Sequence, residues 1–456
     1  MAESIRKFAV SKGLEINSQY MAGGDVGTFK GYCTECLTLH DKFTSLFKVQ
    51  LKDSKDFYKA LKKAFEEFFN KKLTQVVQGK AGEEETREMT QPELLGQYVD
   101  ALMKRDADLG ISTAEDETIC VEKCTQLFTY LQEKDIFQEL YKTKLAKRLL
   151  QTSLNEDLER AMLEKLQREM GKSYTHHLEG MLKDRDVGKD LQAKYVDYVK
   201  AKEIVQPCEF VAQVLTTGHW PPFKADKIIL PDTLKNCIAV FDRFYKGASS
   251  AHQTRVLSWV HALGTVNLTA KFNSGPKEVT MSVFQTCILL LVDKSVRISV
   301  KALSEQIGVE AAKLRPYIAS LSLNKAYAII SKCDSEGNPS DTKGIQDTDY
   351  FKYNDAYVNK VRKFKVPPPV AAEDSRPPAQ VVSDNRRFVI DACTVRVMKS
   401  RRELRFQILI NEVVDQLSKT FKPEPKVIKQ RIEDLLTRGY LERDEGDPTL
   451  FRYLTH

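Results

Sequence analysis

The sequence predicts a mainly α-helical protein with a small α/β part, arranged as several domains in a row. Helical periodicity dominates the first two hundred residues, short β-favouring segments follow Pro207, and a pattern of three helices and two strands then occurs twice. A chain of 456 residues is too long for one hydrophobic core, because single cores rarely grow past about 250 residues.

The first predicted domain, residues 1–85, is a helical segment. Over residues 29–77 apolar side chains recur at three- and four-residue steps, as Leu61 and Phe65 illustrate. Residues 79–88 are polar and acidic and contain glycines that break this pattern. We therefore expect a linker there, before a longer helical region begins.

The second predicted domain, residues 91–205, is a helix bundle, because amphipathic stripes such as Leu94 and Tyr98 follow one another with short joins. Residues 206–282 differ, with short β-favouring segments and frequent turn residues. They predict a small mixed α/β unit. Its expected strands include Phe210–Thr216 and Val266–Phe272.

Residues 283–364 and 386–456 each show three helices followed by two strands, which is typical of a winged-helix domain. In the last domain we expect helices at 387–399, 406–419 and 425–437. Residues 365–385 contain five prolines, which favour an extended chain and oppose helix packing. We therefore expect the last domain to be tethered and able to move.

Composition argues against several classes of protein. The chain is 42% hydrophobic and 29% charged, and its longest apolar run, Cys287–Val292, is far shorter than the roughly 20 residues that span a bilayer. Nine scattered cysteines fit a reducing interior, so we expect the cytosol or nucleus and no membrane. The sequence has no phosphate loop, dinucleotide motif or catalytic constellation, so we expect neither enzymatic activity nor a cofactor. Cys33 and Cys36 form a lone CxxC, and no metal site is expected.

The stretch Val395–Leu404 (VRVMKSRREL) is the most informative of the chain. A 3.6-residue period puts Val389, Ile390, Cys393 and Val397 on one helix face, so Lys399 points to solvent. A lysine directed outward beside fixed positive charge suits the attachment of another protein. From charge alone, a solvated basic helix end is the more common interpretation.

A second basic group, Lys144, Lys147 and Arg148, recurs at three- and four-residue steps on one predicted helix face. Such a face could steer an acidic partner. The alternative is a solvated face over an apolar stripe that contains Leu145 and Leu149, and the pattern alone does not choose between them.

The two winged helices also invite a nucleic-acid-binding interpretation, in which the third helix enters the major groove. In the last domain that helix carries Lys426, Lys429, Arg431 and Arg438, with Glu433 and Asp434 among them. Residues 386–456 contain fifteen Lys and Arg against eleven Asp and Glu, an excess of four. This excess is weak for a phosphate-binding surface, so nucleic-acid binding is kept only as an alternative.

Several segments, taken in order, resemble the cullins, the elongated scaffolds of multisubunit ubiquitin ligases. They are Pro92–Leu95 (PELL), Phe128–Phe137 (FTYLQEKDIF), Tyr141–Leu150 (YKTKLAKRLL), Leu178–Asp184 (LEGMLKD), Val214–Pro221 (VLTTGHWP), Phe284–Leu289 (FQTCIL) and Phe388–Leu404. Together they span roughly residues 90–456, and the combination is specific. Leu182 and Arg185 depart from the usual phenylalanine and methionine, at positions that we interpret as packing drift.

The resemblance implies that Lys399 accepts a ubiquitin-like modifier, with Arg396, Met398, Arg401 and Arg402 contacting the conjugation machinery. A RING-finger protein would add a strand to the sheet expected from Phe210–Thr216 and Val266–Phe272. It would recruit a ubiquitin-conjugating enzyme, steered by Lys144, Lys147 and Arg148. The chain itself would be a non-catalytic scaffold that acts by proximity.

Cullins begin with three helical repeats, the first of which docks a substrate-receptor adaptor. Here residues 1–85 leave room for one repeat at most and resemble the last one, so adaptor binding is doubtful. A further alternative is therefore a truncated cullin that sequesters the RING subunit.

Overall fold

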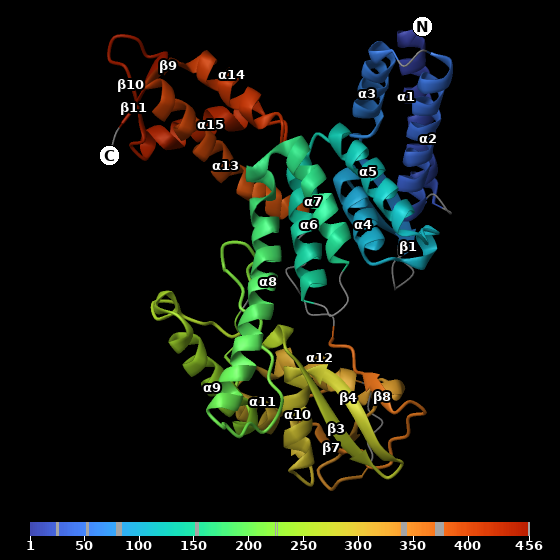
Figure 1. The fold of residues 1–456 in the computed structure, drawn as a ribbon, viewed down its shortest axis with the longest axis vertical. Coiled ribbons are helices and arrows are strands. Elements are labelled where there is room, and N and C mark those ends of the chain that lie inside the picture. The colour runs from blue at the N-terminus through green and yellow to red at the C-terminus, as the bar shows by residue number, and fades with distance from the viewer. Residues whose placement is uncertain are drawn as a thin grey trace. The chain divides into compact units, whose positions relative to one another are not determined.

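The computed structural model describes residues 1–23, 27–51, 54–78, 84–150, 155–223, 225, 227–338, 344–369 and 378–454. The protein is mainly α-helical with small α/β parts, as predicted (Figure 1). It forms two compact units. The first contains Met1–Arg185, Leu215–Pro221 and Arg376–His456, and the second contains Asp186–Val214 and Pro222–Ser375.

The first unit begins with three helices and a β-hairpin. These are α1 (Ala2–Ala22), α2 (Phe29–Gln50), α3 (Lys55–Phe68), β1 (Leu73–Gln78) and β2 (Glu84–Met89). Thr28 caps α2 by accepting a hydrogen bond from Gly31 N (3.0 Å). Gly13 lets α1 approach α3, because a Cβ there would lie 2.3 Å from the ring of Phe68.

The hairpin corrects two predictions for this region. Helix was expected through residue 77, and a linker over 79–88, but β1 and β2 pair antiparallel from Leu73 with Met89 to Gln78 with Glu84. The expected linker is therefore partly strand, and its residues 79–83 lie outside the described ones.

The helix bundle follows. Its helices are α4 (Gln91–Met103), α5 (Ala114–Tyr130), α6 (Lys134–Leu149), α7 (Glu156–Met170) and α8 (Lys172–Ala201), with a 3-10 turn at Ala107–Leu109. A capping box between Thr90 and Glu93 starts α4. Phe128 and Phe137 are fully buried, with ring centroids 5.0 Å apart, so aromatic packing joins α5 to α6.

The second unit contains helix α9 (Asp232–Ala248) and a three-stranded sheet. Its strands are β3 (Thr265–Phe272), β4 (Gly275–Ser282) and β8 (Lys363–Lys365), in the order β3-β4-β8, with 3-10 turns at Ser250–His252 and His261–Leu263. β3 runs antiparallel to β4, whereas β8 is parallel to it. The expected strand at Val266–Phe272 is confirmed. The one at Phe210–Thr216 is wrong, because this segment has no regular secondary structure.

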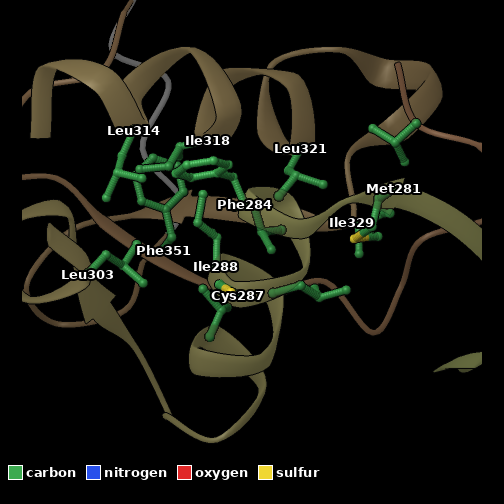
Figure 2. Packing of buried hydrophobic residues seen from close by; sticks show 14 of the residues in the cluster. Met281, Phe284, Cys287, Ile288, Leu303, Leu314, Ile318, Leu321, Ile329 and Phe351 are labelled. Atoms are coloured by element: carbon green, nitrogen blue, oxygen red, sulfur yellow. The ribbon is translucent and has the colours of Figure 1, made fainter. Parts of the chain in front are cut away.

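The first winged helix has the predicted three helices and two main strands. Its elements are α10 (Val283–Asp293), β5 (Ile298–Ser299), α11 (Val300–Ile307), α12 (Ala311–Ser322), a 3-10 turn (Lys325–Tyr327), β6 (Ile330–Cys333) and β7 (Tyr350–Tyr353). In Figure 2, Phe284 and Ile288 of α10 converge with Leu314 and Ile318 of α12 and with Phe351 of β7. All five side chains are buried, so this core fixes the helices against the small sheet.

The C-terminal winged helix belongs to the first unit. Its elements are α13 (Pro378–Arg401), β9 (Glu403–Arg405), α14 (Phe406–Leu417), α15 (Pro425–Thr437), β10 (Leu441–Arg443) and β11 (Leu450–Tyr453). The sheet order is β10-β11-β9.

Helix α13 begins at Pro378, inside the stretch 365–385 that was expected to remain extended. A proline is tolerated in the first turn of a helix, where its missing N–H would have had no partner. The expectation of an extended chain is therefore wrong for the part of the stretch that lies in α13. Residues 370–377 of the stretch lie outside the described ones.

Candidate modification site and partner surfaces

Lys399 lies in the last turn of α13 with its side chain exposed, as its periodicity predicted. The buried face of this helix carries Ile390, Cys393 and Val397, which pack in the core of the last domain. Val389 was also expected on that face, but it is 44% exposed. Lys399 makes no hydrogen bond or ion pair with any described residue, and its side chain is accessible to solvent.

The backbone immediately after Lys399 is fixed by two hydrogen bonds. Arg402 adopts a left-handed conformation (φ 71°) and donates its N–H to Met398 O at 2.8 Å. Its carbonyl accepts a hydrogen bond from Tyr453 N at 2.9 Å, which ties the helix end to β11. Lys399 is therefore an exposed side chain beside a helix terminus held by two backbone hydrogen bonds.

Two of the neighbouring arginines contact residues of α14. Arg396 donates to the side chain of Gln416 (3.1 Å), and Arg401 pairs with Glu412 (3.2 Å). Arg396, Arg401 and Arg402 are all exposed, so these positive charges are accessible within three residues of Lys399 in sequence.

Met398 does not share this surface. Its side chain is 0% exposed and packs in the core of the winged helix. The expectation that Met398 contacts the conjugation machinery is wrong in this conformation. Successive residues of an α-helix are rotated by about 100°, so Met398 points into the core although the adjacent Lys399 points to solvent.

The basic group on α6 is smaller than predicted, because Arg148 is 2% exposed. Its guanidinium hydrogen-bonds Asp100 of α4 and Glu159 of α7, and Glu159 also accepts from Tyr141 (2.7 Å). Burial by itself lowers the pKa of Arg148, but Glu159, Tyr141 and Asp100 together outweigh burial and raise it. Arg148 therefore joins three helices internally, and its proposed role at the surface is wrong.

Lys147 remains exposed, and Lys144 is half-buried with its Nζ 3.6 Å from Asp100 Oδ2. Only these two of the three predicted basic residues face outward. They form the remaining basic surface of α6.

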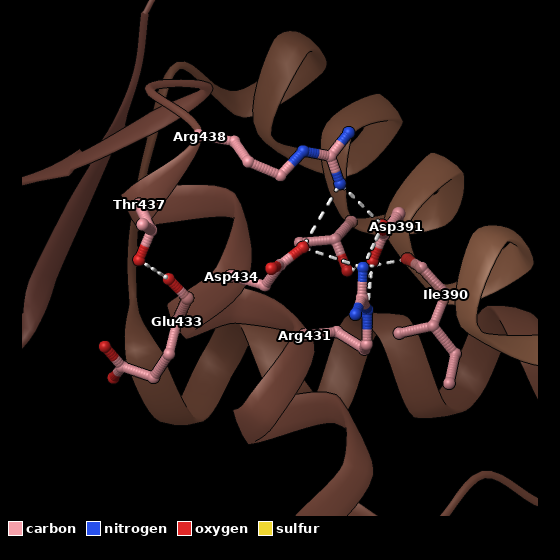
Figure 3. A network of polar contacts seen from close by, with 8 residues as sticks. Ile390, Asp391, Arg431, Glu433, Asp434, Thr437 and Arg438 are labelled. Carbon is pink, nitrogen blue, oxygen red and sulfur yellow. Dashed lines mark hydrogen bonds and ion pairs between the residues drawn. The ribbon is translucent and has the colours of Figure 1, made fainter.

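Arg431 of α15, the third helix of the last domain, and Arg438, which caps its C-terminus, are both used internally (Figure 3). Arg431 donates to Asp391 at 2.7 and 2.5 Å and to Asp434 at 2.8 Å. Arg438 reaches the same two carboxylates at 3.0 and 3.2 Å. Arginines neutralised in this way offer little to a phosphate backbone, so the geometry disfavours the nucleic-acid alternative.

The cysteines of the CxxC motif lie in the core. Cys33 and Cys36 are fully buried on α2, and burial raises the pKa of both thiols. Among the described residues, no group of three or more His, Cys, Asp or Glu is arranged to hold a metal ion. The same part of the chain contains no helix with the length and apolar content needed to cross a membrane.

Strand β3 has a strand partner on one side only among the described residues. Val283 N donates to Gly264 O (3.1 Å), so Gly264 and every second residue after it face β4. The backbone groups of Thr265, Asn267 and Thr269 therefore point to the opposite, open edge. Their side chains are exposed as well.

Sequence reasoning gave no signal for the Arg148, Arg431 or β3-edge arrangements. Each depends on residues from separate helices or strands that only the fold brings together.

Comparisons with known proteins identify the class to which this fold and these sites belong. Three family models match in order: the cullin alpha solenoid domain over residues 1–192, the cullin alpha+beta domain over 214–357 and the cullin protein neddylation domain over 385–447. The chain belongs to the cullin family.

Individual curated relatives of the chain are also cullins. The chain is 36% identical to Cullin-1 of Oryza sativa subsp. japonica over 93% of its own length and 54% of that protein. It is 34% identical to Cullin-2 of Arabidopsis thaliana over 98% of its length and 56% of the relative, and 30% identical to Cullin-4A of Homo sapiens over 93% and 53%. The chain therefore spans about half the length of the curated relatives it matches.

Proposed function

We propose that this chain is the scaffold core of a cullin-RING ubiquitin ligase, activated by conjugation of a ubiquitin-like modifier to Lys399. The observation that carries the proposal is the exposed Lys399 on the end of α13, which pairs with no described residue and lies within the region matched by the neddylation-domain model. An accessible amine on a rigid helix end can meet the active site of a conjugating enzyme without unfolding.

The proposed RING-finger partner binds at β3. Its N-terminal tail adds a strand to the open edge, where Thr265, Asn267 and Thr269 offer backbone donors and acceptors. Strand addition needs main-chain hydrogen bonds and little side-chain specificity, so one edge can hold a tail of varied sequence.

The RING-finger protein then recruits a ubiquitin-conjugating enzyme, and the exposed Lys144–Lys147 surface of α6 steers acidic groups of that enzyme. The chain itself forms and breaks no bonds. It raises the effective concentration of the ubiquitin donor near the substrate, and it would do so in the cytosol or nucleus.

The test is mass spectrometry of the tagged chain purified from its own cells, beside Lys399→Arg and the matched control Lys426→Arg on α15. We expect a stoichiometric RING-finger protein with all three chains, and a modifier remnant on Lys399 in the parent and in Lys426→Arg only. Undiminished modification of Lys399→Arg would contradict the assignment of the site.

The same preparation distinguishes an active scaffold from a sequestering one. We expect the purified complex to assemble ubiquitin chains when activating and conjugating enzymes are supplied. A complex that holds the RING-finger protein but stays inactive with modified Lys399 would favour the sequestering alternative.

A further inference from the structure

Cys208 and Cys237 lie in direct contact within the second unit. Cys208 stands in the segment that follows α8, and Cys237 is in the second turn of α9. Their Sγ atoms are 3.6 Å apart, although the residues are 29 positions apart in sequence. A disulfide requires about 2.05 Å between the sulfurs, so a small side-chain movement would suffice to form one.

The chain on both sides of Cys208 is held by side chains of α8. The amide of Gln206 donates to the hydroxyl of Tyr195, and Gln192 donates to Phe210 O at 2.9 Å. The ring of Tyr195 packs 5.1 Å from that of Phe241 on α9, centroid to centroid. These contacts hold the segment that carries Cys208 against α8, and α8 in turn packs on α9. The short distance between the two sulfurs therefore follows from packed structure.

Cys208 and Cys237 differ in their exposure to solvent, and we expect them to react differently. Of the nine cysteines, Cys208 alone is exposed, whereas Cys237 is 0% exposed. A small oxidant can therefore reach Cys208 first. Burial raises the pKa of Cys237 to about 11, so this thiol is protonated at neutral pH and resists direct oxidation.

We propose that Cys208 and Cys237 form a reversible redox pair, which hydrogen peroxide converts to a disulfide that fastens the segment after α8 to α9. Disulfides in a reducing compartment are usually transient and redox-sensing, which fits one exposed and one buried thiol. This inference does not depend on the proposed ligase function.

The chemistry balances in two steps. The Cys208 sulfur attacks one peroxide oxygen, an S–O bond forms as the O–O bond breaks, and the other oxygen leaves as water with the thiol proton. The Cys237 sulfur then displaces the hydroxyl from Cys208, an S–S bond forms as the S–O bond breaks, and a second water leaves with the Cys237 proton. Two thiols lose two electrons, which reduce one peroxide to two waters, and a dithiol reductant reverses the bond by exchange.

The test uses the full chain, treated with hydrogen peroxide, alkylated with a maleimide and digested without reductant. We expect one linked peptide pair containing Cys208 and Cys237, which dithiothreitol separates. The buried cysteines should stay unlinked, and Cys120 and Cys124, neighbours on one face of α5, are the internal control. We also expect the melting temperature to rise by several degrees on oxidation of the parent and not of Cys208→Ser.

A second variant keeps the proposal falsifiable. In Cys237→Ser we expect Cys208 to stop at the sulfenic acid, which dimedone traps. Oxidation of Cys208 in the parent straight to the sulfinic acid, without the linked peptide, would overturn the proposal, as would a link to any other cysteine. If Cys237→Ser does not fold, the peptide map of the parent and the melting of Cys208→Ser still decide the question.

Discussion

The guanidinium of Arg148 lies 2.5 Å from a carboxylate oxygen of Asp100, 48 residues earlier in the chain, and both side chains are buried. Burial by itself raises the pKa of Asp100, but Lys104 and Arg148 outweigh it and lower the pKa. Arg148, although it belongs to a basic sequence motif, therefore stabilises the interior of the helix bundle.

We therefore expect Arg148→Met to destabilise the first unit by about 3–5 kcal/mol, because Glu159 would remain buried without its cation and Asp100 would lose its buried one. Lys147→Met changes the adjacent, exposed position in the same way and should shift stability by less than about 0.5 kcal/mol. Urea unfolding of both variants measures this. An Arg148→Met chain of normal stability that binds the conjugating enzyme weakly would contradict the structural role.

Two proline substitutions at adjacent positions of β3 test whether a partner strand binds at its open edge. Thr269→Pro removes a backbone N–H that points to the open edge, whereas Leu268→Pro removes one that faces β4. We expect Thr269→Pro to keep most of its thermal stability but lose the RING-finger protein on co-purification, and Leu268→Pro to lose stability. Retention of the partner at normal stoichiometry by Thr269→Pro would rule out strand addition at this edge.

Met398 distinguishes packing from recognition beside Lys399. Met398→Ala should cost about 2–5 kcal/mol by leaving a cavity in the winged-helix core. Met398→Leu keeps the volume and should cost less than about 1.5 kcal/mol. We expect the leucine variant to be modified on Lys399 at nearly the normal rate, as mass spectrometry of the reaction over time would show. A large loss of modification in a stable Met398→Leu chain would restore a direct role in recognition.

The burial of the His40 imidazole predicts that the stability of the folded chain depends on pH. It is 5% exposed, its Nε2 lies 3.0 Å from the Tyr130 hydroxyl, and burial lowers its pKa. The folded chain therefore stays unprotonated at His40 as pH falls below about 6.5, whereas the unfolded chain binds a proton. Stability should fall from pH 7.5 to 5.5, and less so in His40→Gln. Equal losses in urea unfolding of the two chains would exclude His40 as a source.

Much of the architecture could be predicted from local sequence. The 3.6-residue period of α13 placed Ile390, Cys393 and Val397 inside and Lys399 outside, and β-favouring residues located β3. The three-helix pattern identified both winged helices. These features depend on residues close in sequence, whose geometry the backbone fixes without help from distant segments.

What the tertiary structure decided depends on distant residues. Arg148 and Lys147 are adjacent and both basic, yet Arg148 is buried against carboxylates from α4 and α7, whereas Lys147 is exposed. Phe210–Thr216 has strand-forming residues but finds hydrogen bonds to α8, such as Gln192 to Phe210 O, instead of a strand. The sequence alone determined most of the helices, strand β3 and the direction of Lys399 toward solvent. Only the packed chain decided which charges are neutralised, which strand edge stays open and which thiols meet, because each of these depends on groups brought together by long-range folding.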